Sequence, residues 1–275
     1  MSSVAKVMSR GDKMEPVSIE FISEGSCVCG KFFQSFGTTP STTLLLVPGW
    51  PGEPNDVLDL GALLVEQGIN VCIFNPRGLH PSEGFHTHAN TLKDIESALQ
   101  WLRQADVQKR FRVDKTRLIL GGHSYGGGIA MVYAARDPSV RQVISIAGAD
   151  FGEIARETQR NAAFAEEFRR ANMSTRRPEG PAQFDFDAGL KEWVDHQDVY
   201  GLRENAANLA DRSILLIGGW EDKQVTIDQF LLPLYRALWS AGAAKVTFLV
   251  YHTDHEFCNV RHRLASDIAV WLLQD

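Results

Sequence analysis

Residues 117–128 read RLILGGHSYGGG, and this stretch decides the fold. A short apolar run, typical of a buried strand, ends in glycine, and a helix-compatible segment follows over residues 129–136. Gly122-x-Ser124-x-Gly126 between a strand and a helix is the nucleophile-elbow pattern. On so sharp a turn, bulky side chains two positions before or after the serine would collide with neighbouring chain, and glycine removes that clash. The pattern predicts that Ser124 is a nucleophile.

The start of the helix that follows Ser124 supports this interpretation. The N–H groups and the dipole at a helix N-terminus favour negative charge. The backbone N–H of Tyr125 would therefore donate to an oxyanion that forms beside Ser124. A phosphate-binding loop is the rival explanation of a glycine-rich turn after a strand. This stretch lacks the G-x-x-x-x-G-K pattern of such a loop, which makes the rival weak.

Apolar runs without polar alternation recur along the chain, as in strands that are buried on both faces of a parallel sheet. Helical patterns, with apolar residues three or four positions apart, lie between most of them. This alternation predicts an α/β fold with a mostly parallel central sheet and helices on both faces. Residues 17–21 and 27–35 flank a Ser-Glu-Gly-Ser turn and indicate an N-terminal antiparallel hairpin. The apolar runs are residues 44–47, 71–74, 118–120, 143–146, 214–217 and 246–250.

The alternation breaks once, between about residues 151 and 211. This stretch is rich in charge, has apolar residues at helical intervals and holds the breaker cluster 177–181, RPEGP. We interpret it as a helical lid inserted into one domain; a long crossover with extra helices is the alternative. The expected organisation is a flexible tail over residues 1–16 and a single domain over residues 17–275.

With Ser124 on its elbow, the chain resembles the α/β-hydrolase family over most of residues 17–275. In that family a triad acid follows the strand after the lid, often as G-x-x-D, and a histidine follows the last strand. The resemblance implies Asp222 as the acid, in Gly219-x-x-Asp222, and His255 as the base. The order Ser124, Asp222, His255 is the order expected for this fold. Three alternatives stay open: Asp150 or Glu221 for the acid, and His252 for the base.

The resemblance also implies a second oxyanion donor. The run 44–47 ends in Pro48-Gly49-Trp50, where the family usually has His-Gly and then the donor residue, so the backbone N–H of Trp50 takes that role. Pro48 departs from the family pattern, but a backbone donor needs no particular side chain. The side chains of Trp50, Trp220 and the lid aromatics are candidates for an apolar acyl pocket.

These residues predict a serine hydrolase that works through an acyl-enzyme on a small-molecule acyl substrate, with no metal or organic cofactor. A carboxylic ester is the first choice of substrate, because activated esters need the least leaving-group assistance. A peptidase or amidase comes second and a thioesterase third. The alternative of another class is a non-catalytic member of the fold that binds a small molecule or a protein.

Other histidines and an arginine carry weaker expectations. His86 and His88 alternate and could in principle ligate a metal, but no third ligand is apparent, so a solvated loop is expected. The loop that begins at Asn75 is similar to a family loop, and we expect Arg77 to be its hydrogen-bonding hub.

Composition sets the remaining expectations. The net charge of −6 argues against nucleic-acid binding. Cys27 and Cys29 have neither zinc-knuckle nor redox spacing, although on a strand they share a face. We expect no disulfides and, since no signal peptide or membrane-length apolar stretch is evident, a cytoplasmic protein that does not enter membranes. The sequence permits a homo-oligomer.

Overall fold

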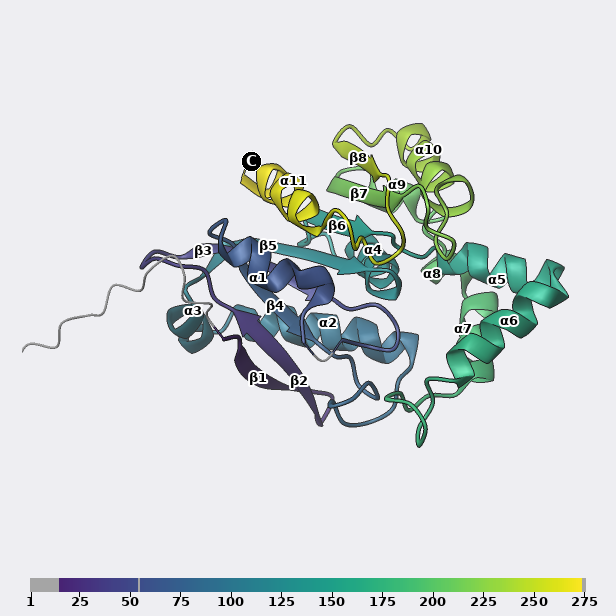
Figure 1. The fold of residues 1–275 in the computed structure, drawn as a ribbon, viewed down its shortest axis with the longest axis horizontal. Helices are drawn as coiled ribbons and strands as arrows, with labels where there is room; N and C mark the ends of the chain where they lie inside the picture. The colour runs from purple at the N-terminus through teal and green to yellow at the C-terminus, as the bar shows by residue number, and fades with distance from the viewer. Residues whose placement is uncertain (1–14, 54, 274–275) are drawn as a thin grey trace, which may run out of the picture.

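The computed structural model describes residues 15–53 and 55–273. Most of the expected N-terminal tail, residues 1–16, lies outside this part of the chain. The described residues form one eight-stranded sheet with the order β1-β2-β4-β3-β5-β6-β7-β8 (Figure 1). Its strands are β1 (Val17–Ser23), β2 (Ser26–Phe33), β3 (Ser41–Val47), β4 (Asn70–Phe74), β5 (Val113–His123), β6 (Gln142–Ile146), β7 (Ser213–Gly219) and β8 (Val246–Tyr251).

The predicted edge hairpin is confirmed. Strands β1 and β2 pair antiparallel, and β2 is also antiparallel to β4. The turn between β1 and β2 uses Glu24 and Gly25, with φ of 47° and 81°, the left-handed pair that a type I′ hairpin turn requires. All pairings from β4 to β8 are parallel, as the apolar runs predict.

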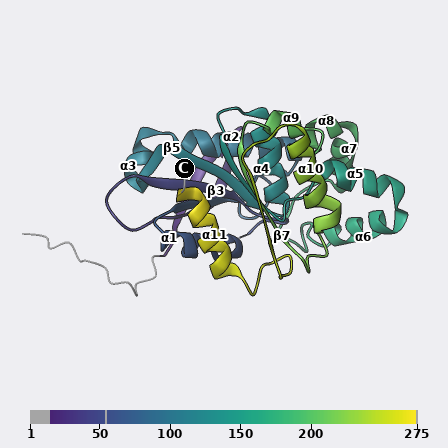
Figure 2. The same cartoon turned by 90° about the horizontal axis from the view of Figure 1, so that it is seen from above.

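Helices cover both faces of the sheet. On one face α1 and α11 pack against each other, and α2 and α4 pack together on the opposite face (Figure 2). Helix α4 lies on β5 and β6, so the strand that leads into Ser124 is buried by the helix that leaves it. The helices outside the insertion are α1 (Leu60–Val65), α2 (His88–Leu102), α3 (Ala105–Phe111), α4 (Tyr125–Arg136), α10 (Leu232–Ser240) and α11 (Arg261–Leu273), with short turns at Val57–Asp59 and Ile227–Leu231.

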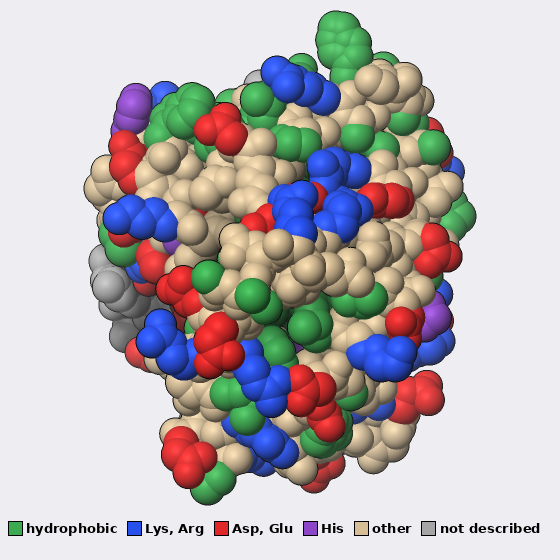
Figure 3. All heavy atoms as spheres, turned by 90° about the vertical axis from the view of Figure 1, so that its right-hand side faces the viewer, with side chains coloured by type: hydrophobic (Ala, Val, Ile, Leu, Met, Phe, Trp, Pro, Cys, Tyr) green, Lys and Arg blue, Asp and Glu red, His purple; other side chains and the backbone are tan. Residues whose placement is uncertain are grey.

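A helical insertion separates β6 from β7. Its helices are α5 (Phe151–Arg160), α6 (Ala162–Met173), α7 (Phe186–Asp195), α8 (Gln197–Tyr200) and α9 (Ala206–Leu209). Helices α5, α6 and α7 project from one end of the sheet, at the right of Figure 1. Acidic and basic side chains are interspersed on this face of the molecule (Figure 3), which agrees with the ion pairs of Glu153 with Arg156, Arg160 and Arg203.

The hydrophobic core follows the central strands. Leu44, Leu45 and Leu46 of β3 are fully buried, although successive side chains of a strand point to opposite faces. Both faces of β3 are therefore covered, which explains why its sequence shows no polar alternation. Among the described residues, no helix is both long and apolar enough to span a lipid bilayer.

Candidate active site

Ser124 occupies a strained turn between β5 and α4. Its φ of 55° and ψ of −119° lie in a region that residues with a Cβ rarely adopt. A Cβ on Gly122 would come within 2.2 Å of the Gly126 backbone, and one on Gly126 within 2.0 Å of the Val47 carbonyl oxygen. A side chain at either position would therefore collide with the backbone, as predicted, and glycine is required on both sides of the serine.

His255 lies between Ser124 and Asp222. Its Nε2 is 2.9 Å from the Ser124 Oγ, and its Nδ1 is 2.7 Å from the Asp222 Oδ2. With Nδ1–H donating to the carboxylate, Nε2 is left as the acceptor for the serine hydroxyl. His255 and Asp222 are buried, so their hydrogen bond is shielded from water. The three residues come from segments more than 30 positions apart and meet in one array.

The array is fixed by contacts with the backbone. The second oxygen of Asp222, Oδ1, accepts hydrogen bonds from the N–H groups of Gln224 and Val225 at 2.8 and 2.9 Å. On the other side, Nε2 of His123 is 2.9 Å from the carbonyl oxygen of His255. Burial lowers the pKa of His123 to about 3, which makes it neutral near pH 7 and a hydrogen-bond donor to that carbonyl. These contacts hold the carboxylate and the loop of His255 in position.

The three alternative residues are engaged elsewhere. His252 is exposed and faces Glu221, with 3.3 Å between its Nδ1 and the carboxylate. Asp150 caps the N-terminus of α5 and accepts a hydrogen bond from the Leu202 N–H at 3.2 Å. Asp150 therefore connects parts of the insertion, whereas Asp222 is the carboxylate that contacts His255.

Two backbone donors flank the serine. The Tyr125 N–H opens α4, and the Gly49–Trp50 segment runs beside Ser124, since a Cβ on Gly49 would lie 3.3 Å from the Ser124 Cβ. Among the described residues, neither the Trp50 N–H nor the Tyr125 N–H has a hydrogen-bond partner. Two free backbone donors next to a serine hydroxyl can stabilise negative charge that develops on a substrate oxygen.

Comparisons with known proteins agree with this geometry. Residues 42–178 match the sequence family described as alpha/beta hydrolase fold. An acylaminoacyl peptidase of Pyrococcus horikoshii superposes with a TM-score of 0.70 at 18% identity, over 95% of this chain and 42% of that protein. The chain has the α/β-hydrolase fold.

Two esterases share the fold over nearly their whole length. The Pyrococcus furiosus esterase has a TM-score of 0.67 at 13% identity, with 94% of this chain and 91% of that chain covered. The esterase domain of a Rhodothermus marinus protein has a TM-score of 0.62 at 18% identity, with 94% of this chain and 100% of that chain covered. The chain spans less than half of the acylaminoacyl peptidase, and at these identities the likeness shows the fold alone. No curated protein sequence matches this chain.

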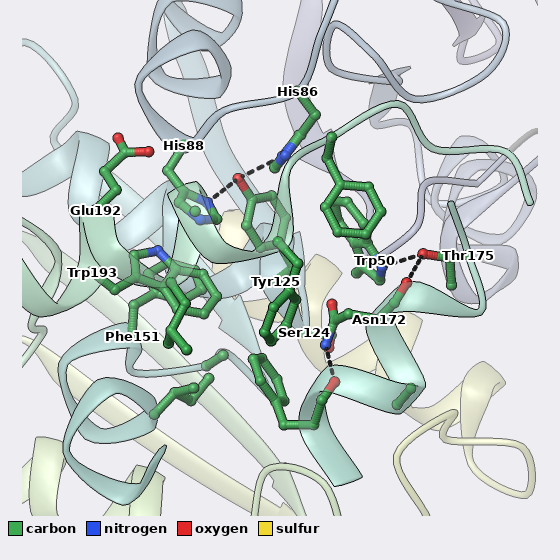
Figure 4. A pocket seen from close by; sticks show the side chains of 18 of the residues that line it. Trp50, His86, His88, Ser124, Tyr125, Phe151, Asn172, Thr175, Glu192 and Trp193 are labelled. Atoms are coloured by element: carbon green, nitrogen blue, oxygen red, sulfur yellow. Dashed lines mark hydrogen bonds between the residues drawn. The ribbon is translucent and has the colours of Figure 1, made fainter. Parts of the chain in front are cut away.

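In this α/β-hydrolase fold, Ser124 opens into a cavity of about 600 Å³ between the sheet and the insertion. The body contributes Trp50 and Tyr125, while α5, α6 and α7 contribute most of the apolar wall (Figure 4). The Trp50 Nε1 donates to the Thr175 Oγ1 at 2.9 Å, which ties the body to the insertion. The aromatic side chains from the insertion are Phe151, Phe164, Phe168, Phe184, Phe186 and Trp193.

The expected solvated loop around His86 and His88 is wrong. Both side chains are buried in the cavity wall, where the Tyr125 hydroxyl lies 3.1 Å from the His86 Nε2 and 3.2 Å from the His88 Nδ1 (Figure 4). The His88 ring stacks on Trp193 with 4.3 Å between centroids. Burial lowers the pKa of His86 to about 3 and that of His88 well below its ordinary value, so both are neutral hydrogen-bonding groups.

The side chain of Trp220 does not line this cavity, which contradicts the sequence-based expectation. It is 54% exposed at the end of β7, and its backbone N–H pairs with the Tyr251 carbonyl. Sequence reasoning instead missed His86 and His88, which reach the cavity only because the chain before α2 folds over the elbow. Their signal in the sequence was the alternation of two histidines, which also suits an exposed loop.

Proposed function

We propose that this protein is a serine hydrolase that cleaves carboxylic esters through an acyl-enzyme on Ser124. One observation carries the proposal: the continuous hydrogen-bonded array from the Ser124 Oγ through His255 to Asp222. A buried imidazole with a carboxylate on one nitrogen and a hydroxyl on the other is the arrangement that activates a serine.

The reaction has two acyl-transfer steps. The Ser124 oxygen attacks the substrate carbonyl carbon while the His255 Nε2 accepts the serine proton. Asp222 stabilises the imidazolium that forms, and the free N–H groups of Trp50 and Tyr125 stabilise the oxyanion. His255 then gives its proton to the leaving alcohol oxygen as the carbon–oxygen bond breaks. Water attacks the acyl-enzyme by the same route, with His255 again as base, and releases the acid.

The cavity supports an ester with a bulky apolar acyl or alkoxy group. Apolar side chains from α5, α6 and α7, many of them aromatic, line it, and burial of apolar substrate surface there contributes about 25 cal/mol per Å². The charged residues on the wall are one lysine and three acids: Lys223, Glu167, Asp185 and Glu192. A small acetyl group would leave most of this space unfilled and gain little from it.

A fluorophosphonate probe tests the serine. The wild type should be labelled at Ser124, and Ser124→Ala should lose both labelling and about 10⁴-fold or more of the esterase kcat. His252→Ala is the matched control, because His252 is exposed and lies in the loop that also carries His255. Equal labelling of wild type and Ser124→Ala, or of neither, contradicts an enzymatic role and favours the non-catalytic alternative.

A substrate panel tests the bond that is cleaved. We expect kcat/KM to be highest for p-nitrophenyl esters with bulky acyl groups, lower for acyl-CoA thioesters and lowest for aminoacyl anilides. The Ser124→Ala variant supplies the background for each substrate. A higher kcat/KM on anilides than on esters would replace the ester proposal with a peptidase or amidase.

A further inference from the structure

The outer face of the β1–β2 hairpin carries a cluster that the proposed hydrolysis does not use. Glu20 of β1 lies directly opposite Cys29 of β2, and Cys27 is two positions before Cys29 on the same strand. Side chains of directly paired residues, and of residues two apart, share one face of a sheet. Glu20, Cys27 and Cys29 therefore point to the same side, away from the buried residues Val28 and Phe32.

The distances within this cluster suit a metal ion. One carboxylate oxygen of Glu20 and the two sulfur atoms of Cys27 and Cys29 all lie within 4.8 Å of one another. Zinc bound to two thiolates at about 2.3 Å and to a carboxylate at about 2.0–2.2 Å needs ligand atoms slightly closer than this. Rotation of exposed or half-buried side chains can supply the remaining shift, since the backbone register already brings them together.

The charges near the cluster also favour a cation. The carboxylate of Glu83 is held beside it, where it accepts a hydrogen bond from the Cys27 N–H at 2.8 Å. Lys31 is the next residue of β2 on this face, but its ammonium bonds to the Asn55 side chain at 3.0 Å. The cluster thus combines two soft sulfur donors with two carboxylates, and no lysine or arginine of the described residues pairs with them, which favours a divalent cation over an anion.

We propose that Glu20, Cys27 and Cys29 form a binding site for a thiophilic divalent cation of the zinc class. On binding, each thiol releases its proton to solvent and forms a sulfur–metal bond, and water fills the fourth position. The two sulfur ligands exclude Mg²⁺ and Ca²⁺, which bind oxygen.

The site adjoins a loop that reaches the substrate cavity. The Cys29 N–H donates to the Ser82 Oγ at 2.9 Å, and the Glu83 N–H donates to the Cys27 carbonyl at 3.0 Å. Phe85, in the cavity wall, follows two residues later. A bound cation would stiffen the hairpin to which this loop is hydrogen-bonded. We therefore expect cation binding to stabilise the fold and to leave the chemistry at Ser124 unchanged.

Cobalt titration of the reduced, metal-free full chain tests the site. One equivalent of Co²⁺ should produce a thiolate-to-cobalt charge-transfer band with the visible absorption of tetrahedral cobalt, and Zn²⁺ should displace it. The Cys27→Ser/Cys29→Ser double variant should lose the band, and Glu20→Gln should weaken binding by about 10-fold or more. Cys258→Ser, which removes an exposed cysteine elsewhere, is the matched control and should keep the band.

Two results would overturn the proposal: no band in the wild type, or an equal band in the double variant. Unchanged cobalt affinity in Glu20→Gln would remove the carboxylate from the ligand set. Circular dichroism checks that each variant is folded; the substitutions lie on the solvent side of the hairpin. Ser124→Ala should bind cobalt as the wild type does, which separates this site from the proposed hydrolysis.

Discussion

At the scale of single residues, the backbone of the elbow is both strained and closely packed. Ser124 has φ of 55°, and the turn brings the Gly126 backbone against the end of β3. A side chain at position 126 cannot move aside, because the atoms that it would meet belong to the backbone of Val47 and Pro48. Ser124 can keep its position on the turn only if Gly122 and Gly126 remain glycine.

Gly126→Ala should therefore lower the free energy of unfolding by about 4 kcal/mol or more. Gly242→Ala is the comparison: Gly242 has φ of 86° but open space around its Cβ position, so only the backbone strain of about 1–2 kcal/mol applies. Urea unfolding of both variants measures the difference. Equal losses would mean that the contact with β3 does not matter.

Two of the buried aspartates, Asp222 and Asp150, should separate by function. Asp222→Asn removes the charge that pairs with an imidazolium of His255 and should lower kcat about 10³–10⁴-fold with little change in KM. Asp150→Asn disturbs the N-terminus of α5 and should act mainly on stability. Esterase kinetics and thermal unfolding of both variants check this assignment. A larger kcat loss in Asp150→Asn would move the acid role to Asp150.

At the scale of elements, one ion pair fixes the loop between β4 and α2. Arg77 donates to the two oxygens of Asp94 from its N–H and its Nε, at 2.8 and 2.6 Å, and both residues are buried. Its guanidinium also reaches the Asn90 carbonyl. The expectation that Arg77 is a hydrogen-bonding hub is confirmed. This loop carries His86 into the cavity wall, so the ion pair positions part of the site.

Asp94→Ala should cost about 3–5 kcal/mol of stability, because it leaves the Arg77 charge buried without its partner. Lys93→Ala, one residue away on α2, breaks an exposed pair with Glu96 and should cost less than about 1 kcal/mol. Denaturant unfolding provides both values. Similar small losses would show that Arg77 finds another partner or reaches water.

The helical insertion forms part of the wall of the substrate cavity. Phe164 of α6 is half-buried, stacks near Phe168 and lines the cavity. Phe164→Ala should lower kcat/KM for a bulky p-nitrophenyl ester by about tenfold, while acetate ester hydrolysis changes little. Trp239→Ala, an aromatic truncation at a residue that is 64% exposed, should leave both values unchanged. An equal effect on both esters would mean that α6 only packs on the body.

Over the whole molecule, three buried histidines couple stability to pH. Burial holds the pKa of His86 and of His123 at about 3 and that of His88 well below its ordinary value. In the unfolded chain these residues take up protons near pH 6.5. The unfolded state therefore binds more protons between pH 6.5 and about 3, and the stability present above pH 6.5 is lost as the pH falls through this window.

His86→Gln should flatten the decline of stability between pH 6.5 and pH 4, measured by urea unfolding at several pH values. His252→Gln, at an exposed histidine, should keep the wild-type slope. If His86→Gln retained that slope, His86 would have to be protonated in the folded protein.

The sequence alone determined the fold and the chain order of the array. Uninterrupted apolar runs specify strands buried on both faces, and Gly122-x-Ser124-x-Gly126 specifies a turn that only glycine permits, so both are local consequences of sterics and burial. The resemblance to the α/β-hydrolase family then pointed to Asp222 and His255. The elbow could be inferred from residue identities alone, whereas Asp222 and His255 rested on that resemblance.

Only the tertiary structure decided which groups meet. The choice between Asp222 and Asp150 rests on a 2.7 Å contact across segments that the sequence cannot bring together. His86 and His88 lie in the cavity wall and Trp220 is exposed to solvent, because side-chain direction at a loop depends on how that loop packs on its neighbours. Likewise, the proposed cation site at Cys27 and Cys29 depends on the hairpin register, which sets Glu20 opposite Cys29. Local rules fix each element, but long-range packing fixes the chemistry between them.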